Sequence, residues 1–209
     1  LPSFPFLGLV VSGGHTSLFI IYDFQKFELL GKTRDDALGE AYDKVAKILG
    51  LGFPGGPIIE ERAKNAVEKK SLFPIARLEG SFDFSYSGLK TAVLYYVREK
   101  KQLSQQEINE ICYSFQESAL RSLIPPLEMA IKKFKIQSLI VGGGVAVNTR
   151  LRELLKQLNI NVYLPSYQYC MDNASMVAAL GYWVYNKESS MGVDFGPYST
   201  FEERWNSLH

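Results

Sequence analysis

The chain has 209 residues, of which 46% are hydrophobic, and its net charge is +1 at neutral pH. This composition supports a sizeable core and argues against a protein that binds nucleic acid through overall positive charge, so any contact with RNA would depend on local patches. Two cysteines without a CxxC pair, and no apolar run of about 18 residues, argue against a disulfide framework and a transmembrane helix and favour a cytoplasmic protein that does not enter a membrane.

The first third of the chain predicts a β-meander followed by two helices. Three short strands with brief loops between them are expected at 6–11, 17–22 and 27–33. Asp35 or Asp36 is expected to cap a helix that runs to about Leu49. A loop rich in glycine and proline follows, and Pro57 suits the first turn of a second helix, which is expected to end near Lys70.

The rest of the chain predicts further helices and then two strand–helix units. The expected elements are, in chain order, an extended piece at 82–86, a helix from the cap Ser87 to about Glu99, a long helix from the cap Ser104 that Pro125-Pro126 interrupts and that ends near Lys133, a strand at 138–141, a helix to about Leu158, a strand at 161–164, a helix at about 172–185, and an irregular end at 188–209. This order predicts an α/β fold in which helices pack on a mixed sheet.

The joint between the first two strands is the first candidate site. It reads Ser12-Gly13-Gly14-His15-Thr16, whereas a plain hairpin needs only two turn residues. Glycines let a ligand approach the backbone, and successive N–H groups can hold an anion. The alternative is a tight glycine hairpin in which His15 is a packed polar residue.

The helix that follows the meander carries carboxylates on one face. Helical spacing places Asp36, Glu40 and Asp43 together, with Lys47 one turn above Asp43. Their mutual repulsion would be relieved by a ribose, a cation or a basic partner, and only weakly by the Asp43–Lys47 pair. The alternative is a solvated acidic face.

Two more glycine turns precede helices. Gly55 and Gly56 lie just before a helix N-terminus, whose free N–H groups favour polar or anionic ligands, and Glu60 one turn later could face the same space. Three glycines at 142–144 follow a buried strand, where α/β proteins bind ligands, and Asn148 can donate and accept hydrogen bonds there. The alternatives are ordinary capping at the first turn and a close strand–helix turn capped by Asn148 at the second.

A last candidate lies at the start of the final predicted helix. Asp172 and Asn173 stand there, and the pattern fits either an N-cap or a carboxylate that faces a metal ion or a phosphate. The sequence contains only two histidines, His15 and His209, so it holds no HExxH zinc motif and indicates no Ser-His-Asp triad.

Together these motifs resemble one family closely, the TsaD-type tRNA threonylcarbamoyladenosine synthases, once described as O-sialoglycoprotein endopeptidases. The stretches that carry the resemblance span nearly the whole chain and are LVVSGGHTSL, DDALGEAYDKVAKILGLGFPGGP, FDFSYSGLKT, GGGVAVNTRLR and YCMDNASM. The resemblance implies an actin-like ATPase fold of the ribonuclease-H-like type, a mixed sheet with helices on both faces. It implies that 1–5 is a linker and that 6–209 is a C-terminal lobe, with an N-terminal lobe outside this sequence.

The resemblance also implies a reaction and its binding residues. The family transfers a threonylcarbamoyl group from threonylcarbamoyl-adenylate to N6 of the adenosine at position 37, beside the anticodon, in tRNAs that read codons beginning with adenine. Asp43 and Glu60 would face the ribose, although the position of Glu60 varies in the family, Gly56 would approach the nucleotide through its backbone, and Asn148 would lie on the base side. The residues implied to line the adenylate through the first hairpin are Val10, Val11, Ser12, Gly13 and Gly14.

The implied metal site is incomplete in this sequence. Asp172 matches a carboxylate ligand of the family's divalent ion, Fe²⁺ or Zn²⁺, but the two histidines of the family's HxxxH motif do not occur here. A lone carboxylate does not hold a transition metal tightly. We therefore expect this chain not to retain the metal and to be inactive alone. The resemblance implies that the whole protein is an acyltransferase, with TsaB- and TsaE-type partners if it is bacterial.

Other functions remain open at the level of sequence. A sugar or acid kinase of the same fold class would also place glycine hairpins around ATP phosphates. A non-catalytic lobe that binds a nucleotide or a partner protein would need the same motifs without turnover. The old metalloprotease description has no support, because no histidine pair lies beside a base that could activate water.

Overall fold

The computed structural model describes residues 2–23, 26–100 and 102–187. The chain divides into two compact units, Leu1–Asp172 and Asn173–His209. The described part of the second unit is dominated by helix α7 (Ala174–Lys187), and all the other described helices and strands belong to the first unit. The expectation for 188–209 lies outside the described residues.

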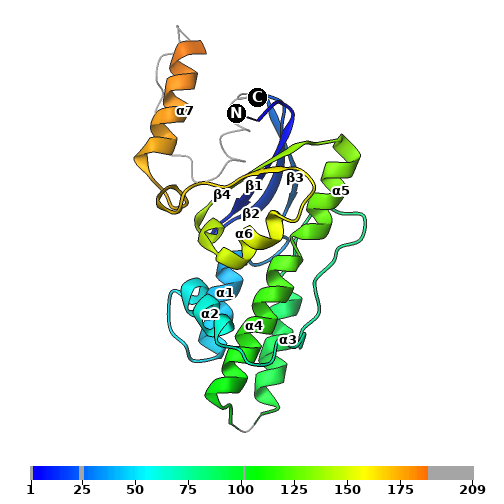
Figure 1. Cartoon of the computed structure of the whole chain (residues 1–209), viewed down its shortest axis with the longest axis vertical. Helices are drawn as coiled ribbons and strands as arrows, with labels where there is room; N and C mark the ends of the chain where they lie inside the picture. The colour runs from blue at the N-terminus through cyan, green and yellow to red at the C-terminus, as the bar shows by residue number, and fades with distance from the viewer. Residues whose placement is uncertain (1, 24–25, 101, 188–209) are drawn as a thin grey trace. The chain divides into compact units, whose positions relative to one another are not determined.

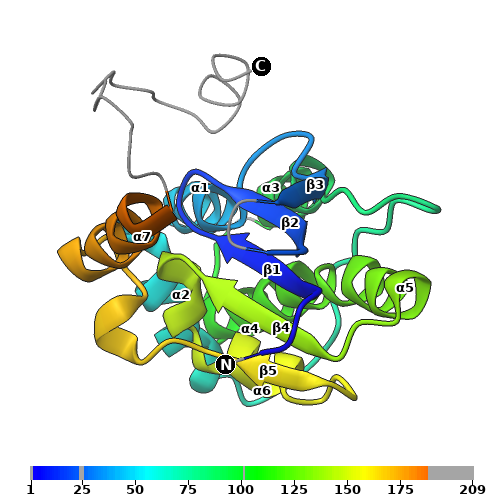
Figure 2. The ribbon, with the colours of Figure 1, turned by 90° about the horizontal axis from the view of Figure 1, so that it is seen from above.

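The centre of the first unit is one five-stranded sheet in the order β3-β2-β1-β4-β5 (Figures 1 and 2). Its strands are β1 (Phe6–Val11), β2 (Thr16–Ile21), β3 (Phe27–Lys32), β4 (Ser138–Gly142) and β5 (Asn161–Tyr163). The three strands of the meander pair antiparallel, whereas β4 pairs parallel with both β1 and β5. The predicted single mixed sheet and the α/β class are therefore confirmed.

The alternation of side chains along the meander places the core on one face of the sheet. Leu9 pairs with Leu18 across the β1–β2 ladder, and both are fully buried. The neighbouring Val10 points to the other face and is 37% exposed. Because successive residues of a strand point to opposite faces, this difference fixes which face the helices cover.

The helices follow the predicted order, but the long helix expected from Ser104 to about Lys133 is two helices, and Ser87, the expected cap of the helix before it, is the first residue of that helix. The described helices of the first unit are α1 (Leu38–Ile48), α2 (Gly55–Lys64), α3 (Ser87–Arg98), α4 (Gln105–Arg121), α5 (Ile124–Phe134) and α6 (Thr149–Leu155), with short 3-10 turns η1 (Gly144–Val147) and η2 (Tyr167–Tyr169). Figure 1 shows α1 to α4 gathered below the sheet, where α2 contacts α1 and α4, and α3 contacts the same two helices.

Two helix boundaries are correct for the expected physical reason. Ser104 caps α4 by accepting a hydrogen bond from the N–H of Glu107, whose carboxylate accepts one in return from the N–H of Ser104. The prolines at 125 and 126 lie in the first turn of α5, where the missing N–H groups cost nothing, so the chain ends α4 and restarts there.

The expected cap of α1 is wrong. Its N-cap is Ala37, and neither Asp35 nor Asp36 fills that role. Asp35 instead caps α3, because its carboxylate accepts hydrogen bonds from the N–H groups of Tyr86 and Ser87 at 2.7 and 3.1 Å. Burial opposes ionisation of Asp35, but these bonds and those from the hydroxyls of Ser85 and Ser87 outweigh it and lower the pKa of the carboxyl.

The acidic face predicted on α1 is neutralised within the protein. Asp36 lies before the helix and bonds the ammonium groups of Lys44 and Lys90, the latter at 2.6 Å. Glu40 pairs with Lys44 at 2.8 Å. Asp36 and Lys90 therefore tie the start of α1 to α3, and neither an external cation nor a basic partner is needed to relieve the repulsion.

The second helix is shorter than expected, because α2 ends at Lys64 and not near Lys70. The extended piece around Phe84 is confirmed in part by a parallel bridge between Thr33 and Phe84. None of the helices in the described part of the chain combines the length and the apolar character needed to cross a membrane.

Candidate functional site

The carboxyl ends of β1 and β4 lie side by side and begin the site. Both strands run in the same direction, and Val10 pairs with Gly142 at the last position of the ladder. Just beyond, Gly143 lies so close to Val11 that a Cβ atom on the glycine would be 2.3 Å from the carbonyl oxygen of Val11. In Figure 2 the arrowheads of β1 and β4 point to the same side of the sheet, where α2 lies.

The hairpin after β1 is held by hydrogen bonds of Ser12, and its two glycines are exposed. The N–H of Ser12 donates to the carbonyl of His15 at 2.8 Å, and the hydroxyl of Ser12 accepts from the N–H of His15 at 3.0 Å. Gly13 and Gly14 are exposed, and a Cβ on either would meet nothing within 4 Å. His15 is also exposed, so the alternative of a packed histidine is wrong.

The same hairpin supplies the cap that α1 lacks in its own sequence. The hydroxyl of Thr16, buried at 1% exposure, accepts from the N–H of Leu38 at 2.8 Å. The carbonyl of Ser12 accepts from the N–H of Gly39 at 3.1 Å. The first turn of a helix has N–H groups without partners in the helix, and the hairpin satisfies two of them. The N-terminus of α1 is thereby fixed against the turn.

Asp43 joins α1 to the second glycine turn. Its Oδ1 accepts a hydrogen bond from the N–H of Gly55 at 2.7 Å, in the first turn of α2. Gly55 also lies against the backbone of Tyr42 and Asp43, where a Cβ would come within 2.5 Å of a carbonyl oxygen. Gly56 has open space at its Cα. Glycine is therefore needed at 55 for packing, whereas at 56 the protein leaves room beside the backbone.

Glu60 joins α2 to the third glycine turn. Its Oε1 accepts from the N–H of Thr149 at 2.9 Å, at the start of α6. A shallow polar cleft of about 370 Å³ opens beside this contact, between α2, α4 and α6, and its lining includes Lys64, Gln116 and Arg150. A carboxylate at a helix N-terminus is stabilised by the helix dipole. Because Oε1 of Glu60 already accepts from Thr149, part of the hydrogen-bonding capacity of this carboxylate is used within the protein.

Asn148 is the N-cap of α6, as one of the alternatives had it. Its Oδ1 accepts from the N–H of Leu151 at 2.9 Å, and its Nδ2 donates to Oε1 of Gln116 at 2.9 Å. Both amide side chains are buried, at 5% exposure for Asn148 and 4% for Gln116. The amide of Asn148 is thus held in one orientation, and the second hydrogen of Nδ2 is its remaining donor.

These contacts form one continuous circuit at the carboxyl end of β1 and β4. The circuit links the three glycine turns through helices α1, α2 and α6, and each link is a backbone approach or a hydrogen bond. Its members, in order, are Val11–Gly143, Ser12–Gly39, Asp43–Gly55, Glu60–Thr149 and Asn148. All the predicted binding residues from Val10 to Asn148 lie on this circuit or next to one of its members.

Sequence reasoning missed two residues of α4 that support the circuit. Gln116 holds Asn148, and Glu117 forms a bidentate pair with Arg150 of α6, whose Nη2 lies 2.9 Å from Oε2. Burial raises the pKa of Glu117, but Arg150 and then Arg121 outweigh it and lower the value. Gln116 had a detectable signal, because it is a polar residue in the apolar stripe of α4 formed by Cys112, Phe115, Ala119 and Leu120.

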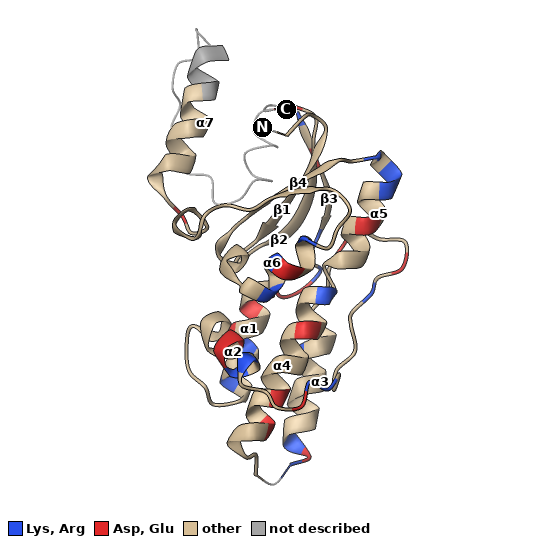
Figure 3. Ribbon diagram, viewed as in Figure 1, with Lys and Arg blue, Asp and Glu red and all other residues tan. Residues whose placement is uncertain are grey.

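The charges around the circuit are mixed. Figure 3 shows acidic and basic residues interspersed along α2 and α4 without a face of one sign. Several are paired within a helix, as Lys64 is with Glu60 and Glu61 at 3.8 Å. A polyanionic partner would therefore meet local groups of charge on this unit and not a broad basic surface.

Asp172 belongs to none of the contacts of this circuit and is the last residue of the first unit. It is exposed and is not the cap of α7, because Asn173 takes that role by accepting from the N–H of Met176 at 3.1 Å. Among residues 2–23, 26–100 and 102–187, no three His, Cys, Asp or Glu side chains are grouped so that they could hold a metal ion. The described residues therefore do not fit a divalent metal by themselves, and no chemical step is assigned to one here.

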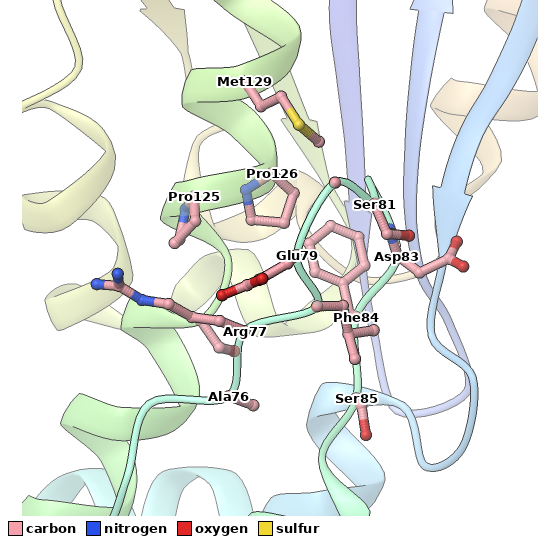
Figure 4. Close-up of a pocket in the computed structure, with 13 residues that line it drawn as sticks. Ala76, Arg77, Glu79, Ser81, Asp83, Phe84, Ser85, Pro125, Pro126 and Met129 are labelled. Atoms are coloured by element: carbon pink, nitrogen blue, oxygen red, sulfur yellow. The ribbon is translucent and has the colours of Figure 1, made fainter.

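A different cavity, of about 220 Å³, lies between the loop after α2 and the start of α5 (Figure 4). Arg77, Glu79, Pro125 and Met129 are among the residues that line it, and none of the predicted binding residues is. Its walls include the turn at Gly80, and the helix that borders it, α5, has prolines in its first turn, which lack N–H groups. It is an alternative location for ligand binding.

Comparison with known proteins assigns the family. A model of the family "TsaD: tRNA N6-adenosine threonylcarbamoyltransferase" matches residues 1–179. The tRNA N6-adenosine threonylcarbamoyltransferase of Thermodesulfovibrio yellowstonii is 50% identical over 191 residues, which cover 87% of this chain and 56% of the relative. The enzymes of that name from Kosmotoga olearia and Borrelia duttonii are 44% and 45% identical over 94% and 95% of this chain, and 58% and 60% of their own lengths.

Among solved structures, the activator of 2-hydroxyisocaproyl-CoA dehydratase from Clostridium difficile with bound ADPNP matches 92% of this chain and 66% of its own, with a TM-score of 0.47 and 13% identity. The chain spans a little over half the length of the curated relatives it matches. By the extent of the family match and by identity to its relatives, the chain belongs to the TsaD family of tRNA N6-adenosine threonylcarbamoyltransferases.

Proposed function

We propose that this chain is the nucleotide-binding part of a tRNA threonylcarbamoyltransferase and that the adenylate lies against the circuit of glycine turns. The observation that carries the proposal is the circuit itself, because it brings three turns with accessible backbone to one end of the sheet. Membership of the family supports the reaction class. Ligands of α/β proteins bind beyond the carboxyl ends of parallel strands, where this circuit lies.

Each part of the ligand has a proposed contact. The phosphate lies at the N–H group of Gly13 and at the N-terminus of α2 near Gly56, where backbone dipoles favour negative charge. The N–H of Gly14 beside it donates to the hydroxyl of Ser12 at 3.3 Å. The ribose hydroxyls donate to the second carboxylate oxygen of Asp43, since the first is used by Gly55. The base lies toward Asn148, whose remaining amide hydrogen can face it, and Glu60 completes the pocket at α6.

The proposed reaction is an acyl transfer. The exocyclic amine of adenosine 37 in tRNA attacks the carbamoyl carbon of the mixed anhydride, a new C–N bond forms, and the bond from that carbon to the phosphate oxygen breaks. The phosphate oxygen keeps the electron pair and leaves as AMP, while the amine loses a proton. The contribution of this chain is to bind the adenylate and to stabilise the negative charge that develops on the departing phosphate.

A metal ion enters this proposal only through Asp172. If Fe²⁺ or Zn²⁺ is bound in the whole enzyme, Asp172 supplies one ligand and residues outside the described part of this chain supply the others. We also propose that the 209-residue chain alone gives no turnover, and that TsaB- and TsaE-type proteins are the partners of the whole enzyme if it is bacterial.

The test is a hydrogen-exchange footprint of the 209-residue chain with a non-hydrolysable sulfamate analogue of threonylcarbamoyl-adenylate. The proposal expects slower exchange at 12–16, 38–43, 55–60 and 142–149, and no change in the 76–85 loop that lines the cavity of Figure 4. Asp43→Ala is expected to weaken the analogue about tenfold or more, as loss of a charge-assisted hydrogen bond does. Protection confined to 76–85, or no protection at saturating analogue, would refute the proposed site.

The activity of the whole enzyme is a separate measurement. Labelled threonine is followed from threonylcarbamoyl-adenylate into tRNA by the full-length protein with its partners. Incorporation that depends on Asp43 and on an adenosine at position 37 of the tRNA supports the reaction. Phosphorylation of a sugar or an acid from ATP, without threonine incorporation, would instead favour the kinase alternative.

A further inference from the structure

The segment from Pro165 to Met171 leads from β5 to Asp172 and has little regular structure of its own. Its only helical piece is the short turn η2, held by the N–H of Tyr169 donating to Ser166 at 2.9 Å and that of Cys170 donating to Tyr167 at 3.3 Å. Tyr167 and Tyr169 are 59% and 51% exposed, whereas Cys170 is 3% exposed. Sγ of Cys170 also donates to the carbonyls of Pro165 and Ser166, at 3.9 and 3.6 Å. These bonds shape the segment locally, and its position on the protein depends on contacts with other elements.

The side chain of Arg152 contacts this segment at three residues. Arg152 of α6 donates from Nη2 to the carbonyl of Pro165 at 2.7 Å and to Sγ of Cys170 at 3.3 Å. Its guanidinium carbon lies 4.3 Å from the centre of the Tyr167 ring, which is a cation–π contact. Arg152 therefore contacts the beginning, middle and end of the segment.

The same guanidinium also donates a hydrogen bond to the third glycine turn, at 142–147. Nε of Arg152 donates to the carbonyl of Ala146, in η1, at 2.7 Å. Directly beside it, Met171 lies over Gly144, where a Cβ would be 2.9 Å from Sδ of the methionine. Arg152 thus connects two regions that the chain separates by some twenty residues, the turn beyond β4 and the segment that ends at Asp172.

Only arginine fits this arrangement. The contacts use Nε and Nη2 in directions fixed by the planar guanidinium, and the face of the same plane covers Tyr167. A lysine would keep the charge but would offer one nitrogen at the end of a flexible stem, so it could not serve Ala146 and Pro165 in the same geometry.

We propose that Arg152 is a positioning residue that sets the place of Asp172 relative to the glycine turn at 142–147. We call the contacts of Arg152 with Ala146, Pro165, Tyr167 and Cys170 the Arg152 clamp. The role of Asp172 in catalysis rests on the proposed function, whereas the clamp rests on these contacts alone. Arg152 acts through the Pro165–Met171 segment and does not touch the reacting groups. Its loss would loosen that segment while the sheet and α6 stay folded.

The first experiment tests the clamp without reference to activity. Hydrogen exchange is measured in the 209-residue chain for the original sequence, Arg152→Lys and Arg152→Met. Exchange at the N–H groups of Tyr169 and Cys170 is expected to accelerate about tenfold or more in both variants, because those bonds belong to the segment that the clamp holds. Alkylation of Cys170 should accelerate in parallel, with the fully buried Cys112 as the internal reference.

Arg150→Met is the matched control. Arg150 lies on the same helix and pairs with Glu117 and Glu153. Its removal is expected to lower overall stability, yet to leave exchange at 169–170 unchanged relative to the rest of the chain. If Arg152→Lys exchanges like the original sequence, or if Arg150→Met loosens the segment equally, the clamp is refuted.

The second experiment connects the clamp to Asp172 in the full-length enzyme. Arg152→Lys is expected to lower kcat for threonylcarbamoyl transfer about tenfold while KM for the adenylate changes less than about threefold. Adding Asp172→Asn to Arg152→Lys should lower kcat by a smaller factor than Asp172→Asn does in the original enzyme, because both substitutions affect the position of the same carboxylate.

If Asp172→Asn alone has no effect, the proposed role of Asp172 fails, while faster exchange at 169–170 would still support the clamp. Equal losses in kcat and in adenylate binding by Arg152→Lys would contradict a positioning role.

Discussion

Gly143 and Val11 are in contact at the point where the two parallel central strands end. The φ angle of Gly143 is +99°, which side chains rarely adopt, and a Cβ there would lie 2.3 Å from the carbonyl oxygen of Val11. Both the conformation and the space thus require glycine. This approach of two backbones lets the turn after β4 begin beside the hairpin after β1, and it starts the circuit of contacts around the candidate site.

Replacing Gly143 with alanine is expected to lower the free energy of unfolding by about 3 kcal/mol, since the backbone strain and the clash add. Gly56→Ala is the comparison, because Gly56 has no positive φ and a Cβ there meets nothing within 4 Å. Its stability should be unchanged or raised by up to about 1 kcal/mol. Urea unfolding of both variants gives the two values. Equal losses would show that the two turns do not differ as described.

The pair between Asn148 and Gln116 is expected to be coupled. Asn148→Ala removes a helix cap and leaves a buried acceptor on Gln116 without its partner, which together cost about 2 to 4 kcal/mol. Adding Gln116→Leu removes that acceptor, so the double variant should be less destabilised than the sum of the single variants by about 1 kcal/mol. The double-mutant cycle is measured by denaturant unfolding. Strict additivity would mean that the hydrogen bond contributes nothing.

Acid is expected to weaken the tie between α1 and α3 at Asp36. Burial raises the pKa of Asp36, but hydrogen bonds from Lys44 and Lys90 outweigh it, and the value falls below the ordinary 3.8. A carboxyl with a lowered folded-state pKa contributes stability above 3.8 and loses it as the pH falls through the folded value.

Asp36→Asn should therefore be less stable than the original sequence near neutral pH and should lose less stability on acidification below 3.8. Thermal unfolding at several pH values across that range gives the change of stability with pH for the original sequence and for Asp36→Asn. Asp35→Asn is a comparison that leaves the lysine pairs of Asp36 intact, and it should also flatten the profile because the pKa of Asp35 is lowered too. Parallel pH profiles of the original sequence and Asp36→Asn would mean that Asp36 is not the group responsible.

The sequence signals that predicted the fold correctly are those that depend on interactions between residues close together in the chain. The alternation of residues 6–21, the Ser104–Glu107 capping box and the prolines at 125 and 126 each act within one element. The same holds for the glycine turns, whose positions follow from strands that end and helices that begin. Their conformations are decided within a few residues.

The errors at the start of α1 arise where a polar side chain had two possible partners. Asp35 and Asp36 stand before a helix, as caps do, yet Asp35 bonds the start of α3 some fifty residues away and Asp36 bonds Lys90. The cap of α1 comes from Thr16 of the hairpin. Helical spacing gives the face on which a carboxylate lies, but the nearest donor is set by packing between elements.

The sequence by itself determined the sheet-forming segments, the three glycine turns and the family, because these depend on local patterns and on motifs in order along the chain. Only the tertiary structure decided that Asp43, Glu60 and Asn148 have their hydrogen bonds with Gly55, Thr149 and Gln116. It also decided that Arg152 joins the glycine turn to the segment before Asp172. Hydrogen bonds act over about 3 Å, and which groups come within that distance depends on how the helices pack on the sheet.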